Sequence, residues 1–264
     1  GVYQGCRDID NVTMDEIVTL MVGRRILMEY EDRKWEGGKE ILTVRGLSSL
    51  AFNNVDFSVH EGEIFGIAGL AGAGRTETAL AVFGYDASAS GEMYLGGKKV
   101  RFQDPKDAIK SGIGYLTEDR KDAGLFLELN VASNIISANL DNLSSSGIMK
   151  DNDIFKICNE YVEKLNIRTT SIFQKTLNLS GGNQQKLLLA RWIMKKLKVL
   201  IIDEPTRGVD VGAKSEIYDF IRKIAKNGTA VIVISSELPE VLTLCDRIMV
   251  MCQGRKTGEL HHEE

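Results

Sequence analysis

The sequence lacks three features that mark large classes of proteins. No apolar run approaches the roughly 18 residues of a membrane-spanning helix, so we expect that the chain does not itself cross a membrane. The first residues lack the charged and then apolar order of a signal peptide, so we expect no export. Positive charge is not in excess, because 33 lysines and arginines face 37 aspartates and glutamates. This balance gives no electrostatic reason to expect a nucleic-acid partner.

Cysteine is scarce and scattered. Cys6, Cys158, Cys245 and Cys252 form no C-x-x-C pair and have no histidine at ligand spacing. Three of the four lie in apolar sequence surroundings, which favours buried thiols in a reducing compartment over the alternative of a metal site. With 264 residues, of which 43% are hydrophobic, the chain can bury a sizeable core as one large domain or as a domain with a subdomain.

A glycine-rich turn between an apolar run and a helix-prone segment organises the chain. The P-loop pattern G-x-x-x-x-G-K-[ST] is filled at Gly69, Gly74 and Thr76, but Arg75 replaces the lysine. Backbone N–H groups of such a turn can hold an anion at a helix N-terminus, and the threonine hydroxyl can bind Mg²⁺. Arginine is longer and planar, so we expect nucleotide binding to survive and phosphoryl-transfer geometry to suffer. From this turn alone, a ligand-free glycine turn is an equally good interpretation.

Apolar patterns predict an α/β fold with a helical insertion. Continuous apolar runs at 199–202 and 229–234 are typical of strands buried on both sheet faces. The segment 141–147 is loop-like between the helices of the insertion. We expect further strands at 41–44, 55–59, 92–95, 100–102 and 113–116, a last strand at 247–252, and helices at 104–112, 130–138, 151–166 and 213–225.

Residues 1–40 are interpreted as a linker. Thr13 and Glu16 have capping-box spacing, and a charged, glycine-ended segment follows. The form G-x-x-x-G occurs at 1–5 and again at 254–258, so the first copy is expected to close an upstream domain. We assign 1–40 to a linker from that upstream domain, 41–260 to a nucleotide-binding domain with a helical subdomain at about 118–180, and 261–264 to a tail.

Two more motifs point to phosphate chemistry. Asp203 and Glu204 directly follow an apolar strand, where an aspartate can hold Mg²⁺ and a neighbouring glutamate can polarise water. Alone, such a pair is common surface chemistry. Ser180, Gly181 and Gly182 open a helix, which makes an anion site, or, in the simpler interpretation, an ordinary serine N-cap.

The three motifs in this order resemble the ATP-binding cassette (ABC) family over residues 41–260, and Leu-Ser-Gly-Gly-Asn-Gln-Gln at 179–185 is close to its signature. The sequences at 69–77, 117–121, 203–214 and 235–240 are similar to those of the second cassette of bacterial importers for ribose, galactosides, xylose and related monosaccharides. In that group two cassettes are fused in one polypeptide. The resemblance implies a P-loop NTPase core with an antiparallel β subdomain and an α-helical insertion.

The resemblance also implies the site. In this family two cassettes pair head to tail, so that each nucleotide lies between the P-loop of one and the signature of the other. It implies ATP and Mg²⁺ as cofactors, with Thr76 and Asp203 holding Mg²⁺ and Glu204, Ser236 and Glu118 at catalytic positions. Nucleotide contacts are implied at Gly69, Gly72, Ala73, Gly74, Arg75, Thr76, Glu77, Leu179, Ser180, Gly181, Gly182, Gln184 and Asp210.

Departures from the family pattern fall on one half of this site. Arg75 replaces lysine, Glu118 stands where a glutamine is usual, Ser236 replaces the switch histidine, and no aromatic residue near 47–50 can stack on adenine. A carboxylate near a triphosphate is unfavourable, and serine lacks the donor geometry of imidazole. The signature and the loop 208–210, which serve the partner's nucleotide, are intact. We therefore expect the nucleotide site at this cassette's own P-loop to be weak. We expect the signature at 179–185 and the loop 208–210, which together form the surface lent to the partner's nucleotide (the lent surface), to be competent.

The resemblance implies a set of partners and a location. They are the upstream cassette of the same polypeptide, the membrane permease subunits of a sugar importer and, indirectly, an exported sugar-binding protein, at the cytoplasmic face of the cell membrane. Residues 118–165 are expected to contact the permease, unless Leu125, Phe126 and Leu127 are only insertion core. A regulatory, non-hydrolysing cassette and a soluble ABC ATPase serving DNA repair or translation are the alternatives. Asp203 and Glu204 weigh against the first, and the acidic total without heptads against the second.

Overall fold

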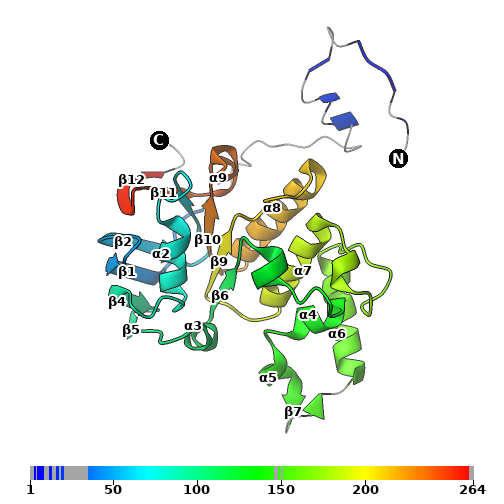
Figure 1. Cartoon of the computed structure of the whole chain (residues 1–264), viewed down its shortest axis with the longest axis horizontal. Helices are drawn as coiled ribbons and strands as arrows, with labels where there is room; N and C mark the ends of the chain where they lie inside the picture. The colour runs from blue at the N-terminus through cyan, green and yellow to red at the C-terminus, as the bar shows by residue number, and fades with distance from the viewer. Residues whose placement is uncertain are drawn as a thin grey trace.

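A central sheet of six strands has helices packed on both of its faces (Figure 1). The computed structural model describes residues 3, 5–8, 12–13, 16–17, 19–20, 35–145, 148–149 and 151–261. The strand order is β12-β11-β3-β10-β9-β6, in which β12 runs antiparallel to β11 and the other neighbours are parallel. The strands are β3 (Ile64–Ala68), β6 (Ile113–Leu116), β9 (Val199–Asp203), β10 (Ala230–Ser235), β11 (Arg247–Cys252) and β12 (Arg255–His261).

Alternate residues of the central strands face two hydrophobic cores, because successive side chains of a strand point to opposite faces. Leu200 and Ile202 lie in one core with helices α7, α8 and α9, whereas Val199 and Ile201 lie in the other with α2. Burial on both faces explains why these strands are continuous apolar runs. The helices are α2 (Arg75–Val82), α7 (Gly181–Ile193), α8 (Val211–Lys226) and α9 (Leu238–Leu244).

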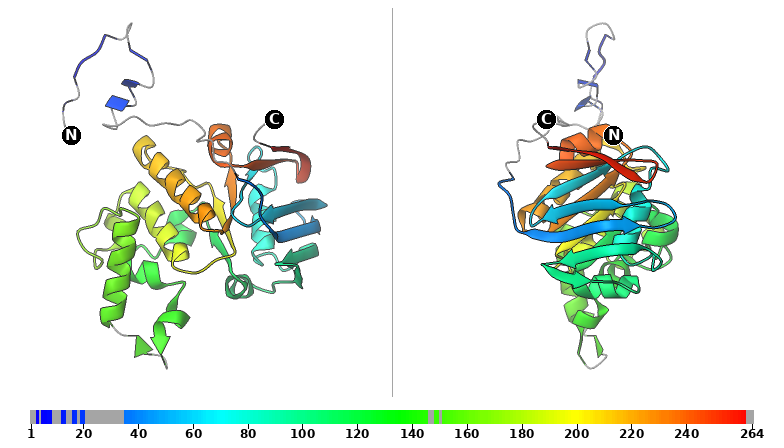
Figure 2. Two further views of the ribbon diagram at one scale, coloured as in Figure 1. Left: turned by 180° about the vertical axis from the view of Figure 1, so that it is seen from behind. Right: turned by 90° about the vertical axis from the view of Figure 1, so that its left-hand side faces the viewer.

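The predicted antiparallel β subdomain is confirmed. Its four strands, in the order β2-β1-β4-β5, share the second core with α2 and one face of the central sheet (Figure 2). Helix α3, which follows, has both of its predicted caps. Asp104 accepts a hydrogen bond from Asp107 N at 3.1 Å at the start of the helix, and Gly112 has φ 99° at its end. The elements are β1 (Glu40–Ser48), β2 (Val55–His60), β4 (Ser90–Leu95), β5 (Lys98–Val100) and α3 (Pro105–Ser111).

A helical insertion joins β6 to α7, but it is not entirely helical. The loop expected at 141–147 is wrong in detail, because α5 covers its start and the two-residue strand β7 pairs with β8. Strands this short carry no alternating apolar pattern that would reveal them. The elements are the π-helix η2 (Arg120–Gly124), α4 (Val131–Ile136), α5 (Leu140–Leu143), β7 (Ser144–Ser145), β8 (Ile148–Met149), α6 (Asp151–Lys164) and the 3-10 turn η3 (Thr176–Asn178).

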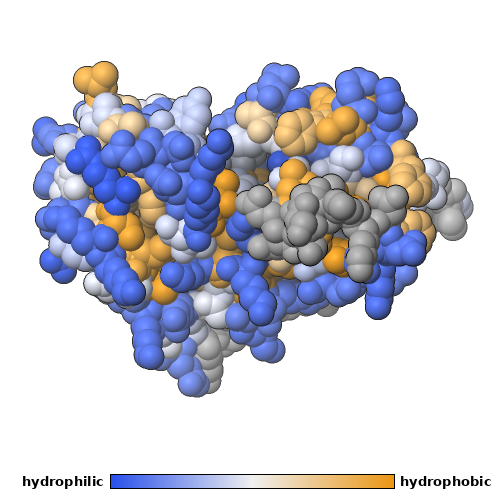
Figure 3. Space-filling model, turned by 90° about the horizontal axis from the view of Figure 1, so that it is seen from below, coloured by the Kyte–Doolittle hydropathy of each residue, from blue (hydrophilic) through white to orange (hydrophobic). Residues whose placement is uncertain are grey.

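The insertion exposes apolar side chains, and Figure 3 shows apolar surface on the half of the molecule where it lies. Leu125 is buried and belongs to the core, Leu127 packs against the core, and Phe126 is 54% exposed. The interpretation as insertion core therefore holds for Leu125 and Leu127 but not for Phe126. Other exposed apolar residues of the insertion are Leu129, Leu140, Phe155, Phe173 and Leu177.

Other sequence expectations need correction or are confirmed locally. β11 is not the last strand, because β12 follows as a polar edge strand without apolar alternation. Cys158 and Cys245 are buried, but Cys6 and Cys252 are exposed. The capping box is confirmed, since Thr13 N donates to Glu16 Oε2 at 3.0 Å and Glu16 N donates to Thr13 Oγ1 at 3.3 Å.

Most of the linker expected at 1–40 lies outside the described residues, and so does most of the tail. Among the residues that are described, no helix is long and apolar enough to cross a bilayer.

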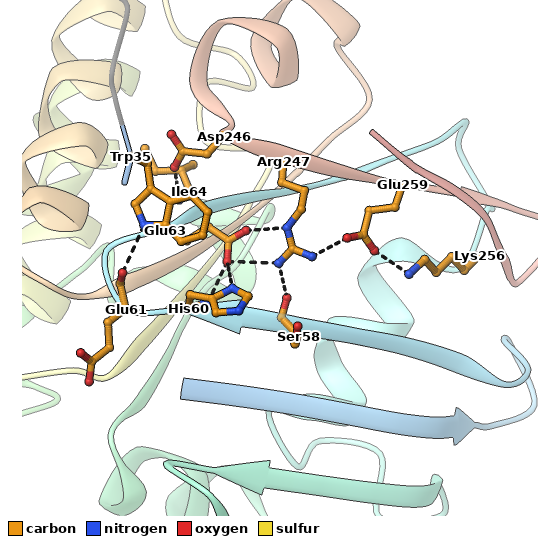
Figure 4. A network of polar contacts seen from close by, with 10 residues as sticks. All are labelled: Trp35, Ser58, His60, Glu61, Glu63, Ile64, Asp246, Arg247, Lys256 and Glu259. Atoms are coloured by element: carbon orange, nitrogen blue, oxygen red, sulfur yellow. Dashed lines mark hydrogen bonds and ion pairs between the residues drawn. The ribbon is translucent and has the colours of Figure 1, made fainter. Parts of the chain in front are cut away.

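A buried ion network joins β2, the turn before β3, β11 and β12 (Figure 4). Glu63 is fully buried and accepts a hydrogen bond from Arg247 Nε at 2.8 Å, while Arg247 Nη2 donates to Ser58 O at 2.6 Å. Glu259 also pairs with Arg247, and Lys256 Nζ lies 2.6 Å from Glu259 Oε2. Burial by itself would lower the pKa of Arg247, but the bonds to the two carboxylates raise it. The network fixes the turn from β2 into β3 against the edge hairpin.

Candidate functional site

A cleft of about 450 Å³ is formed by the segments that follow β3, β6, β9 and β10. Parallel strands bring their carboxyl ends to one edge of a sheet, which is where open α/β sheets bind ligands. The cleft unites the predicted P-loop with Glu118, Glu204 and Ser236. Its lining residues are Ala71, Gly72, Ala73, Gly74, Arg75, Thr76, Glu77, Glu118, Glu204, Arg207, Ser236 and Glu237.

The turn from β3 into α2 has a backbone that requires glycine. Gly74 has φ 90° at the N-cap of α2, and a Cβ there would lie 3.1 Å from the Gly254 Cα. Gly72 has φ 77°, with open space where a Cβ would stand. Because the first turn of α2 lines the cleft, its N–H groups, which have no partners within the helix, are available to an anion.

Arg75, which stands at the lysine position, is buried and reaches Glu204. Its Nη2 lies 3.6 Å from Glu204 Oε1, and its Nη1 has no hydrogen-bond partner among the described residues. Glu204 Oε1 also accepts a hydrogen bond from Ser236 N at 2.8 Å. A buried guanidinium with an unused donor fits a phosphate oxygen. However, the same guanidinium already engages the carboxylate that was expected to polarise water.

Asp203 ends β9 below the cleft and is 1% exposed. Tyr115 Oη donates to its Oδ2 at 2.8 Å, while Oδ1 has no hydrogen-bond partner in the described part of the chain. Burial raises the pKa of Asp203, and the Tyr115 and Thr76 hydroxyls oppose that rise. An unused carboxylate oxygen near a threonine hydroxyl fits a hydrated Mg²⁺ ion.

Tyr115 was missed by the sequence analysis because nothing in strand β6 distinguishes it from a packing residue. Its ring stacks on Phe83 with 5.3 Å between centroids, and this contact fixes the hydroxyl that holds Asp203. Next to Asp203, Glu204 has φ 48°, a left-handed conformation that is uncommon for glutamate. Strained backbone of this kind concentrates at functional sites.

Glu118 and Arg207 form an ion pair in the wall of the cleft. Arg207 was not singled out from the sequence, although it lies in the motif segment 203–214. An anion bound in the cleft would attract Arg207 and repel Glu118, and so would weaken the ion pair between them. Ser236, at the switch position, is exposed, and the adjacent Glu237 pairs with Lys214 at 2.7 Å.

The signature turn does not line the cleft but opens α7 elsewhere on the surface. Ser180 is exposed at the N-cap position, yet its side chain makes no capping bond and accepts one from Asn183 Nδ2 at 2.9 Å. Ser180 is therefore the N-cap residue of α7 by its backbone, but its hydroxyl does not cap the helix. At Gly182 a Cβ would lie 2.9 Å from that of Ala213, so glycine allows α7 to approach α8. Asp210 is exposed and caps α8 through Ala213 N at 3.0 Å.

Two residues of the predicted signature contact set point inward. Gln184 is 5% exposed and donates from Nε2 to Thr176 O at 3.3 Å, and Leu179 is also buried. The structure therefore brings neither side chain to a surface where it could contact a ligand. The motif gave the residue types, but not which side of α7 each occupies. Ser180, Gly181 and Asp210 remain as the candidates on this surface.

Comparison with known proteins decides the family. The ABC transporter profile matches residues 52–207, more than half of the chain. The chain belongs to the ABC transporter family. Over its whole length this ABC cassette is 47% identical to a putative ribose/galactose/methyl galactoside import ATP-binding protein of Halalkalibacterium halodurans. Over 97% of its length it is 46% identical to a xylose import ATP-binding protein of Thermoanaerobacter pseudethanolicus. The chain spans only 51% and 52% of those two relatives.

Solved ABC cassettes have the same fold. A nucleotide-free cassette superposes with a TM-score of 0.74 at 21% identity, covering 84% of this chain and 92% of that one. A dimeric cassette in a post-hydrolysis state with ADP and Pi superposes with a TM-score of 0.73 at 20% identity, covering 84% and 99%. The predicted P-loop NTPase core with its antiparallel sheet and helical insertion is thereby confirmed.

Proposed function

We propose that this cassette is the second nucleotide-binding domain of a two-cassette ATPase that drives monosaccharide import. Relatives named for ribose, galactose and xylose import support the sugar class, and their roughly double length supports a second cassette. The upstream cassette would lie on the same polypeptide. The cassette would work at the cytoplasmic face of the membrane, with permease subunits and an exported sugar-binding protein as partners.

The cleft residues fit ATP and Mg²⁺. The turn from Gly72 to Gly74, the first turn of α2 and the unused donor of Arg75 would hold phosphate oxygens. Thr76 and Asp203 would hold Mg²⁺, which neutralises charge on the phosphates when it is bound. Glu204 would orient the attacking water, and Ser236 would stand where a histidine usually assists.

The engagement of Glu204 by Arg75 carries the proposal of an impaired own site. A general base must be free to reach the water that it activates, whereas Glu204 Oε1 is shared by the Arg75 guanidinium and Ser236 N. At the lent surface the exposed Ser180 hydroxyl makes no cap and accepts from Asn183 Nδ2, which leaves its own proton available to donate to a phosphate. We therefore propose slow hydrolysis at the cassette's own site and a signature that completes the upstream site.

The exposed apolar residues of the insertion would receive the permease. Phe126, Phe155 and Phe173 are each more than half exposed, and patches of this kind mark contact surfaces. A regulatory cassette that binds nucleotide without hydrolysis is the second candidate, because the Arg75–Glu204 contact would also suit it. Binding of labelled ATP and ADP without any turnover in the presence of the upstream cassette would favour that candidate.

The proposal is tested by steady-state ATPase of this chain alone, of the upstream cassette alone, and of the two together. We expect the mixture to exceed the sum of the separate rates by at least about tenfold, since a signature supplies transition-state donors of the kind that contribute 10²–10³ in other enzymes. Glu204→Gln in this chain should leave most of that turnover. Brisk turnover by the chain alone, lost in Glu204→Gln, would contradict the division of labour.

A further inference from the structure

Arg120 joins two loops that are distant in sequence. Its Nη1 donates to Gly181 O at 3.2 Å, and its Nη2 donates to Gly208 O at 3.4 Å. Gly181 belongs to the signature turn, and Gly208 opens the loop that ends at Asp210, the N-cap of α8. The guanidinium therefore links both parts of the surface that the proposed function assigns to the partner's nucleotide.

The chemistry of this link requires arginine. A planar guanidinium presents N–H donors in a fixed fork and can satisfy two carbonyl groups with set geometry, whereas lysine offers a single charged point on a flexible stem. Burial lowers the pKa of Arg120, and no ion pair to it is present in the described part of the chain. A cation near the N-terminus of α7 also gains nothing from the helix dipole. Stabilising α7 alone therefore does not account for this arginine.

The segment that carries Arg120 is fixed along α7. Asp119 Oδ1 accepts hydrogen bonds from Lys121 N and Asp122 N, both at 3.0 Å, and so caps η2. At the other end of η2, Arg191 Nη1 donates to Gly124 O at 2.6 Å from the last turns of α7. Arg120 thus bonds the start of η2 to the first residue of α7, and Arg191 bonds the end of η2 to the last turn of α7.

The same segment reaches the cassette's own cleft. Two residues before Arg120, Glu118 pairs with Arg207 in the cleft wall, and Arg207 directly precedes Gly208. Residues 118–120 and 207–208 are thus joined twice, once inside the cleft and once beside the signature turn.

We propose that Arg120 is a positioning residue, which holds the signature turn and the 208–210 loop in register and thereby sets the geometry of the surface lent to the upstream cassette. The proposal rests on the proposed function for its consequence in catalysis, but not for its structural part. Arg120 acts through Gly181 and Gly208 and is not among the residues that line the cassette's own cleft.

The structural part is tested on the chain itself by amide hydrogen exchange. Arg120→Ala should speed exchange at Gln184 and Val209, whose N–H groups bond within these two loops, by at least about threefold, because local opening becomes easier. Lys121→Ala is the matched control, since it removes the same charge from an exposed neighbour. The proposal is overturned if the exchange rates at Gln184 and Val209 rise less than this in Arg120→Ala, or rise equally in Lys121→Ala.

The catalytic consequence is tested in the full-length protein with Glu204→Gln present, so that turnover reports the upstream site. Arg120→Ala should lower kcat by at least about tenfold with KM for ATP changed less than about threefold, as for an interaction made in the transition state. Arg120→Lys should recover only part of kcat. A loss of kcat that instead accompanies a fall in Tm and a larger rise in KM indicates general unfolding and overturns the inference.

A signature variant separates the two proposals. If Ser180→Arg abolishes turnover and Arg120→Ala does not lower it tenfold, the positioning role fails and the proposed function stands. If Ser180→Arg leaves turnover unchanged, the proposed function fails, and hydrogen exchange still decides whether Arg120 positions the two loops.

Discussion

Replacing Ser180 with arginine is expected to stop sugar uptake by the full-length transporter while this cassette stays folded. Ser180 is exposed and its hydroxyl makes no capping bond, so within the described part of the chain the substitution removes the hydrogen bond from Asn183 at 2.9 Å. At the lent surface, however, arginine adds bulk and a side chain that would block the approach of a triphosphate to the start of α7. In enzymes that depend on hydrogen-bond donors to a developing negative charge, the loss of one such donor lowers kcat about 10²- to 10³-fold.

The measurement is uptake of labelled sugar by cells or proteoliposomes, together with ATPase of the purified complex. Ser90→Arg is the matched control, because it makes the same change at an exposed residue at the start of β4, on the antiparallel subdomain. We expect uptake in that control to stay near wild type. Uptake that survives Ser180→Arg, with the variant shown to be assembled in the membrane, would mean that no partner's nucleotide depends on this turn.

The sequence predicted those parts of the fold whose causes are local. β9 and β10 were predicted because both faces of each strand are buried, which leaves a continuous apolar run. Helix α3 was predicted from its caps, which act within a few residues. The polar edge strand β12 was missed because its pairing with β11, rather than its own residues, makes it a strand.

In the candidate site, too, the features with local causes were predicted and those that depend on distant elements were not. The P-loop and the Asp203–Glu204 pair follow from short patterns, but the partners that modify them come from distant elements. Tyr115 reaches Asp203 from β6 and Arg207 reaches Glu118 from the loop after β9, and neither contact has a short-range signal. For Gln184 the motif predicts a ligand contact, whereas the structure shows its buried side chain donating to Thr176 O inside the domain. A motif specifies the residue type at each position, whereas the orientation of each side chain depends on tertiary packing.

Replacing Arg247 with alanine is expected to destabilise the domain by about 3–5 kcal/mol, the range measured when one partner of a buried ion pair is removed. Glu63 is fully buried and would lose its guanidinium partner, and Ser58 O would lose the hydrogen bond from Nη2 (Figure 4). The guanidinium also lies 4.8 Å from the centre of the Phe65 ring, so a packing and cation–π contact is lost as well. Urea unfolding followed by circular dichroism measures the change, with an unchanged m value expected.

Two further variants show whether the lost partner of the buried Glu63 carboxyl is the cause. Lys256→Ala removes a more exposed member of the same network and should change the free energy of unfolding by about 1 kcal/mol or less, because its ammonium is partly solvated. Glu63→Gln combined with Arg247→Met removes both charges but keeps an oxygen that can accept from His60 N, which now donates to Glu63 at 2.7 Å. We expect the double variant to be more stable than Arg247→Ala, because no buried charge then remains unpaired. A double variant as unstable as the single one would instead assign the loss to the missing volume and ring contact of Arg247.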